Sequence, residues 1–324
     1  MRAALLATLG LAAVAPLPAQ GLKVLVVSGL SGEPQYAKSF AANAGALIEQ
    51  ATNAWRVPES DLVYLAERPA ADPGRITGRA TRDEVLSQIG KLATSARPED
   101  VVLIFLLGHG SQQGDEARLS LPGPDLTAGD LAGALSAFTT QTVVVVNSAS
   151  ASGEFVKPLS GKRRVIVAAT KTGFERNATS FADHFVKGLA GGADTDKDGR
   201  TSVAEAFVFA KAEVARQYEA ERRLLTEHAI LDDDGDGAGS ADLGKGTDGA
   251  LARAVSFGGG ASALADDPRA APLLAERKRL ETAIAELRQR KASMDSTAYE
   301  RELETLLLSL ARTNQALRAL DAKP

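Results

Sequence analysis

The chain has 324 residues, a formal net charge of −4 at pH 7 and no cysteine. Hydrophobic and charged residues make up 44% and 24%, which allows a sizeable core and excludes gross disorder. The acidic balance excludes nucleic acid as an expected partner, because the phosphate backbone is bound through clustered Lys and Arg. The absence of cysteine excludes disulfides, thiolate metal sites and a thiol nucleophile.

Residues 1–20 have the pattern of a signal peptide. Arg2 supplies a positive start, residues 3–15 form an apolar run, and Pro16 and Pro18 end that run before a small residue suited to cleavage. The run is short for a membrane span, although an uncleaved anchor is the alternative. We expect a bacterial protein that is periplasmic or secreted, without stable membrane insertion after signal cleavage.

Short β-branched runs alternate with helical patterns over residues 21–257. This alternation predicts an α/β domain with a mostly parallel sheet, right-handed crossovers and helices on both faces. The expected strands are 22–28, 62–66, 101–107, 142–146 and 165–169. The expected helices are 34–52, 81–93, 128–138, 180–189 and 202–222.

Residues able to do chemistry follow two of these strands. Gly108-His109-Gly110 comes after the strand at 101–107, and the small hydroxyl run 147–153 comes after the next one. Functional groups of open α/β sheets gather just past the carboxyl ends of strands. His109 is therefore either a site residue or a turn histidine bonded to backbone, and Ser150 and Ser152 are either nucleophile candidates or helix N-caps.

The order of these motifs resembles the caspase-like peptidase fold, most closely its legumain branch, over about residues 22–209. His109 and Gly110 match the histidine motif, and residues 150–153 match the nucleophile turn, with Ser150 where the family has cysteine. The separation of about forty residues suits such a pair. The resemblance implies an oxyanion hole made by the amides of Gly110 and Ser150. Residues 169–177 look like the legumain segment that walls the specificity pocket.

Serine at position 150 leaves two hypotheses about function. A serine hydroxyl is a weaker nucleophile than a thiolate and needs a close, oriented base, and the sequence shows no carboxylate motif to orient His109. We therefore expect a catalytically weak or silent member of this fold that binds a peptide or protein. The alternative is an active, calcium-stabilised endopeptidase with Ser150 as nucleophile, so the sequence leaves open whether the chain is an enzyme.

Residues 194–205 fit the twelve-residue calcium loop of an EF-hand. Hard oxygen ligands must converge on the ion, and glycine at position six permits the sharp turn. The alternative is a solvated acidic turn with a capping box at its end. The expected calcium ligands are Asp194, Asp196, Asp198, the Arg200 carbonyl, Ser202 and Glu205.

A second, weaker acidic run begins at Asp232. Asp232, Asp234 and Asp236 reproduce the first half of a calcium loop, but Leu243 stands where the bidentate glutamate should be. Calcium here would need a distant ligand or water, and a mobile acidic loop is the alternative. Calcium is the one cofactor that the sequence predicts.

The last part of the chain reads as a separate unit. Residues 258–268 have the composition of a linker, and residues 269–324 carry leucine stripes, partly at the heptad spacing of a coiled coil. We expect an antiparallel helical hairpin whose second helix starts with a capping box of Thr297 and Glu300. The stripes must be covered by the main domain, by the partner helix or by another chain, so a hairpin partner or self-association is among the expectations.

Overall fold

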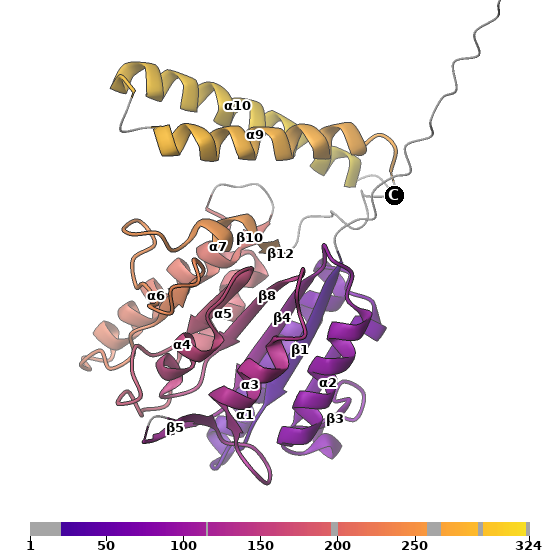
Figure 1. Ribbon diagram of the computed structural model, residues 1–324, viewed down its shortest axis with the longest axis vertical. Helices are drawn as coiled ribbons and strands as arrows, with labels where there is room; N and C mark the ends of the chain where they lie inside the picture. Colours follow the sequence, from indigo (N-terminus) through magenta and orange to yellow (C-terminus); the bar gives the residue numbers. More distant parts are fainter. Residues whose placement is uncertain (1–20, 115, 196–199, 258–266, 291–293, 322–324) are drawn as a thin grey trace, which may run out of the picture.

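The computed structural model describes residues 21–114, 116–195, 200–257, 267–290 and 294–321. A seven-stranded sheet carries helices on both faces, and a helical hairpin lies beyond one end of the sheet (Figure 1). The predicted α/β class is confirmed. The predicted signal peptide lies outside the described residues, as do 258–266 of the predicted linker. No helix in the described ranges is long and apolar enough to cross a membrane.

The main sheet is parallel except at one edge. Its strand order is β11-β9-β8-β4-β1-β2-β3, and only β11 pairs antiparallel, with β9. Strands β4 and β8 pair in register from Val101↔Thr142 to Leu106↔Asn147, so their carboxyl ends lie side by side. The strands are β1 (Leu22–Ser28), β2 (Leu62–Ala66), β3 (Gly78–Arg79), β4 (Val101–Leu107), β8 (Thr142–Asn147), β9 (Arg164–Ala168) and β11 (Ile230–Asp232).

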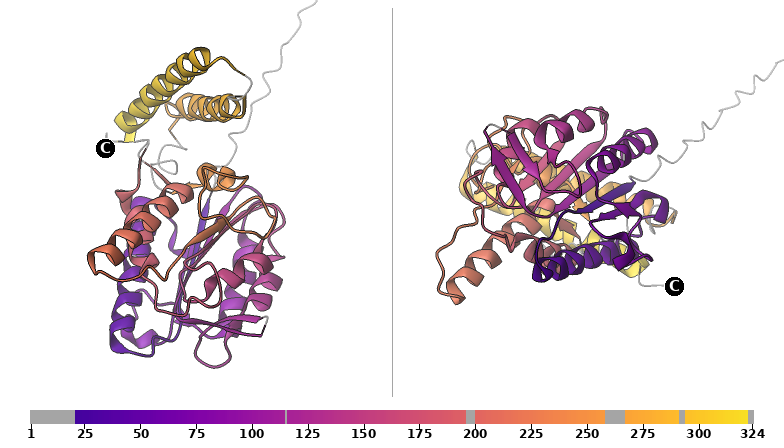
Figure 2. Two further views of the ribbon diagram at one scale, coloured as in Figure 1. Left: turned by 90° about the vertical axis from the view of Figure 1, so that its left-hand side faces the viewer. Right: turned by 90° about the horizontal axis from the view of Figure 1, so that it is seen from below.

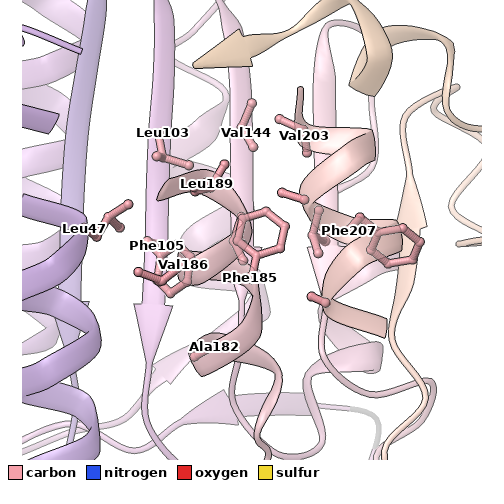
Figure 3. Packing of buried hydrophobic residues seen from close by; sticks show 14 of the residues in the cluster. Leu47, Leu103, Phe105, Val144, Ala182, Phe185, Val186, Leu189, Val203 and Phe207 are labelled. Carbon is pink, nitrogen blue, oxygen red and sulfur yellow. The ribbon is translucent and has the colours of Figure 1, made fainter. Parts of the chain in front are cut away.

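Alternate strand residues supply two cores, one on each face, because successive side chains of a strand point to opposite sides. Leu103 and Phe105 of β4 and Val144 of β8 pack against α1 (Pro34–Glu49), α5 (Phe181–Lys187) and α6 (Val203–Ala220), as Figure 3 shows. Ile104 and Val145 face the other way. They meet α2 (Arg82–Ser95), α3 (Ala128–Leu135) and α4 (Val156–Leu159), which gives the layers visible in Figure 2.

A small three-stranded sheet, which sequence analysis did not predict, follows His109 directly. It consists of β5 (Gly110–Gln113), β6 (Glu116–Leu119) and β7 (Leu126–Thr127) and lies at the carboxyl end of the main sheet (Figure 1). The remaining short elements are η1 (Gln50–Ala54), η2 (Glu59–Asp61), η3 (Pro69–Ala71), η4 (Ser152–Phe155), η5 (Gly188–Gly192), β10 (Thr201–Ser202), α7 (Ala250–Ala254) and β12 (Ser256–Phe257).

The hairpin consists of α9 (Ala271–Arg290) and α10 (Ser296–Asp321), which lie against each other at the end of the domain away from β5 (Figures 1 and 2). Leu280, Leu287 and Leu317 are buried. The predicted capping box at Thr297 is wrong, because α10 begins at Ser296 and Thr297 lies inside the helix. Asp295 caps it instead, accepting a 3.0 Å hydrogen bond from the Ala298 N–H.

Candidate active site

The turn after β8 is shaped by backbone conformation and one side chain. The Oδ1 atom of Asn147, the last residue of β8, accepts a hydrogen bond from the Ala149 N–H at 3.1 Å. Ala151 has a φ of 53°, in the left-handed region that non-glycine residues rarely adopt. The chain therefore reverses sharply at Ser150, and η4 starts immediately after Ala151.

Ser150 is bonded to the backbone of Gly110. The Gly110 N–H donates to Ser150 Oγ at 3.1 Å, and the Ser150 hydroxyl donates to the Gly110 carbonyl oxygen at 3.2 Å. The side chain is buried, with the residue 3% exposed. In this conformation the hydroxyl proton is directed at a carbonyl, and the Gly110 amide expected to serve an oxyanion is occupied by Ser150 itself.

The glycines at the site allow close packing of backbone on backbone. A Cβ on Gly110 would lie 2.2 Å from the Ser150 carbonyl oxygen, and one on Gly153 would lie 2.3 Å from the Lys171 carbonyl group. Such distances are far inside van der Waals contact. At these two positions the absence of a side chain is required by the turn's own packing.

Ser152 joins the ends of two strands. Its Oγ lies 3.2 Å from Thr170 Oγ1 and accepts from the Thr170 N–H at 3.2 Å, and both residues are buried. Neither Ser150 nor Ser152 caps a helix, since Ala151 occupies the N-cap position of η4. The N-cap alternative for these serines is therefore wrong.

His109 is oriented by the loop after β1 and by α1. Its Nε2 lies 3.1 Å from the Ser31 carbonyl oxygen. A carbonyl can only accept, so the neutral imidazole carries its proton on Nε2 and keeps Nδ1 as an acceptor. The ring packs edge-on against Tyr36, with centroids 4.7 Å apart, and lies 5.5 Å from the Phe40 ring. Carbonyl and rings together hold the imidazole in place.

Ser31 is itself held by Glu67, which follows β2. Glu67 Oε2 accepts from the Ser31 N–H at 3.1 Å and from the Ser31 hydroxyl at 2.7 Å. The hydroxyl hydrogen bond is the main reason that the pKa of Glu67 lies below its usual range. Both residues border a cavity of about 820 Å³ between α1 and the loop after β2. The sequence patterns did not single out Ser31 or Glu67, although both follow the ends of strands, where functional groups of such sheets gather.

The segment expected to resemble a pocket wall is tied to the Ser150 turn. The Ala151 N–H donates to the Glu175 carbonyl at 2.8 Å, and the Gly173 N–H donates to Glu154 Oε1 at 3.0 Å. The Glu175 carboxylate lies 2.7 Å from His228 Nδ1 and accepts the His228 N–H at 3.1 Å. His228 is thus a loop histidine that fastens this segment.

Glu227, beside His228, is a buried carboxyl. It is 4% exposed and accepts from the N–H groups of Ser180 and Phe181, at 2.9 and 2.8 Å, at the start of α5. Burial outweighs these bonds and raises the pKa of Glu227 to about 7. The group therefore titrates near neutral pH.

The first acidic loop is described only in part. Asp196 and Asp198 lie within 196–199, outside the described residues. Ser202 and Glu205 form the capping box of α6: the Glu205 N–H donates to Ser202 Oγ at 3.2 Å and the Ser202 N–H donates to Glu205 Oε2 at 2.9 Å. Glu205 Oε1 also accepts from the Thr195 N–H at 3.0 Å. The capping alternative is thus present at the end of the loop, and a helix start of this kind is compatible with a bound ion.

The second acidic run brings three carboxylates together. Oxygens of Asp232, Asp234 and Asp236 lie within 4.8 Å of one another. Asp232 is buried and accepts from the N–H groups of Gly235 and Gly237, at 3.1 and 2.9 Å. The three carboxylates therefore lie beside the backbone turn that follows β11.

A known protein family matches the part of the chain that contains this site. The model of the Peptidase C13 family matches residues 77–228, a span that contains His109 and Ser150. Among solved structures, the chain is similar to a protein from Geobacter sulfurreducens, with 13% identity, 65% of this chain and 92% of that chain covered, and a TM-score of 0.42. It is also similar to caspase-1 from Spodoptera frugiperda, with 10% identity, 70% and 94% covered, and a TM-score of 0.42. No curated protein matches. The C13 match supports the caspase-like peptidase fold that the motifs predicted.

Proposed function

We propose that this chain is an exported caspase- and legumain-like protein that binds peptide or protein segments at the carboxyl edge of its sheet and hydrolyses them weakly or not at all. The observation that best supports weak or absent hydrolysis is the pair of hydrogen bonds between Ser150 Oγ and the Gly110 backbone. The export part rests on the sequence pattern of residues 1–20.

A serine nucleophile must pass its proton to a base as it attacks a carbonyl carbon. Here the Ser150 proton is donated to the Gly110 carbonyl, and His109 Nε2 donates to the Ser31 carbonyl. The Ser150 hydroxyl and the His109 imidazole are thus each hydrogen-bonded to a backbone carbonyl and not to each other. Attack would first require Ser150 to leave both Gly110 bonds, which makes the hydroxyl a poor nucleophile in this state.

One observation favours the active alternative. The Ser31 carbonyl holds the tautomer that leaves His109 Nδ1 free to accept a proton. If Ser150 Oγ moved off Gly110, that amide would become a donor for the oxyanion of a tetrahedral intermediate. The same parts would then serve a serine endopeptidase.

Mass spectrometry of a diverse peptide library separates the two. The protein without residues 1–20 is incubated with the library, alongside the Ser150→Ala variant. The proposal expects little or no cleavage product that depends on Ser150, and retention of a peptide subset by both proteins. Robust wild-type cleavage that disappears in Ser150→Ala would establish the endopeptidase.

Calcium is proposed as a stabilising ion. In the first loop Asp194, Asp196, Asp198, the Arg200 carbonyl, Ser202 and Glu205 would supply hard oxygen ligands. In the second, the support is the convergence of three aspartates within 4.8 Å. Calorimetric titration of the chelator-treated protein with calcium tests both proposed calcium sites. The absence of any heat of binding would contradict both sites.

The hairpin is proposed to mediate self-association. Leu307 and Leu308 of α10 are 42% and 52% exposed, whereas Leu280, Leu287 and Leu317 are buried. Sedimentation of wild type and Leu308→Glu over a range of concentrations tests this. A concentration-dependent dimer that Leu308→Glu weakens supports it, and a monomer throughout contradicts it.

A further inference from the structure

We infer that Glu67 is a positioning residue for His109 and acts through Ser31. The inference rests on the proposed role of His109 in the site. Three hydrogen bonds form a continuous chain from the Glu67 carboxylate, through the N–H and hydroxyl of Ser31, to the Ser31 carbonyl and the His109 imidazole. In this series of hydrogen bonds Glu67 contacts neither Ser150 nor His109, so its influence on His109 is transmitted by the Ser31 backbone.

Glu67 is the anchor at Ser31 itself. The Gly29 and Leu30 N–H groups donate to the carbonyls of Leu107 and Ser120, at 2.8 and 2.9 Å, whereas the Ser31 N–H and hydroxyl both donate to Glu67. Residues 29–32 belong to no helix or strand. The Ser31 carbonyl also accepts from the Glu33 N–H at 2.8 Å, across Gly32 with a φ of 69°. A tight turn of this hand is an uncommon conformation that other contacts must maintain. Glu67 supplies those contacts, at the amide and side chain of Ser31.

The charge of Glu67 suits this task. Hydrogen bonds to an ionised carboxylate are stronger than those to a neutral acceptor. Arg68 Nε lies 3.9 Å from Glu67 Oε1, so a cation stands beside the carboxylate. Ser31 is 4% exposed, which protects its bonds from competing water. The anchored loop then presents its carbonyl to His109 in one direction.

The alternative role for Glu67 is merely to fasten the loop to β2. The tautomer of the His109 imidazole distinguishes the two roles. If Glu67 only fastens the loop, its removal should leave this tautomer unchanged. Without its anchor the Ser31 carbonyl can turn away from Nε2, and the proton is then free to move to Nδ1. The expected change in tautomer ratio is about fivefold, the factor given by loss of one ordinary hydrogen bond of about 1 kcal/mol.

The experiment uses the full chain with ¹⁵N-labelled histidine. The protein has three histidines, so long-range ¹H–¹⁵N spectra above the titration range can be assigned with His109→Gln. Wild type should show His109 as the Nε2–H form. Glu67→Met should shift it toward Nδ1–H, while Glu67→Gln, which keeps an acceptor oxygen but loses the charge, should shift it less. Unchanged His109 signals in folded Glu67→Met overturn the inference.

Two controls keep this result decisive. Glu84→Met removes a carboxylate that accepts from Gln88 on the same helix, and it should leave His109 unchanged. If Glu67→Met does not fold, Ser31→Ala takes its place, because it removes the 2.7 Å bond and keeps the carbonyl. A smaller shift in the same direction supports the inference, and no shift overturns it. The readout needs no turnover, so a silent site would not affect it.

A kinetic arm applies if the Ser150→Cys variant cleaves peptide. Adding Glu67→Met should lower kcat by about fivefold with KM little changed, since the base is misplaced while peptide contacts remain. Loss of cleavage in every variant would count against a cleft that lacks only a competent nucleophile, and the tautomer result would still decide the role of Glu67.

Discussion

The Nε2 atom of His109 lies 3.1 Å from the carbonyl oxygen of Ser31. The imidazole is therefore oriented by a backbone group from the loop after β1. A buried carboxylate fulfils this role in a Ser-His-Asp arrangement and also stabilises the imidazolium that forms during attack. A neutral carbonyl stabilises that cation less, which is a second physical reason to expect weak activation of a serine at position 150.

Gly110→Ala should destabilise the fold strongly. The new Cβ would lie 2.2 Å from the backbone carbonyl oxygen of Ser150, so β5 or the turn must shift. A loss of at least about 2 kcal/mol in the free energy of unfolding is expected, as for other overpacked sites. Urea denaturation measures it.

Gly90→Ala is the matched control. A Cβ on this exposed residue of α2 has no atom within 4 Å, and alanine favours helix over glycine. A gain of about 0.5–1 kcal/mol is expected. Equal effects of the two substitutions would contradict the close approach of Gly110 to Ser150.

Glu227 should make stability depend on pH near neutrality. Its folded-state pKa is raised to about 7 by burial, above the unfolded value. The folded state therefore binds more protons, and stability falls as the pH rises from about 4.5 to about 7. Glu227→Gln should flatten this part of a Tm–pH curve, whereas the exposed Glu219→Gln should not. Parallel curves for wild type and Glu227→Gln would argue against the raised pKa.

Calcium should raise the Tm of the chelator-treated protein. An ion that binds only the folded state stabilises it by about 2.7 kcal/mol at a hundredfold excess over Kd. Glu205→Gln should lose the part due to the first loop but should keep its Tm in chelator, because glutamine also completes a capping box. A Tm that is the same with calcium and with chelator would refute the stabilising role.

The strands of the main sheet were largely predictable. Strands β1, β2 and β4 have the expected limits, because each is a dense run of buried apolar residues. The small sheet was not predictable from pattern, since Gly110–Gln113 is short and polar and is shaped by contacts with the Ser150 turn. β11 was also not predicted, because a strand of three residues is too short to show a pattern.

The location of the site could be predicted from the sequence, but the hydrogen-bond partners of its residues could not. The rule that functional groups follow strand ends leads to His109 and Ser150, which the structure places after the paired strands β4 and β8. Their hydrogen-bond partners depend on loops from distant parts of the chain. Ser31 is 78 residues from His109, and Glu67 is 36 residues from Ser31. Only the folded sheet brings these loops together.

Peptide cleavage by Ser150→Cys, compared with wild type, tests the central claim most directly. A thiolate is partly populated at neutral pH and an alkoxide is not, so a site that lacks only a competent nucleophile should gain activity. The account predicts weak or no wild-type cleavage of a broad peptide library, measurable cleavage by Ser150→Cys, and its loss when His109→Ala is added. Robust wild-type turnover that Ser150→Ala abolishes would contradict the account.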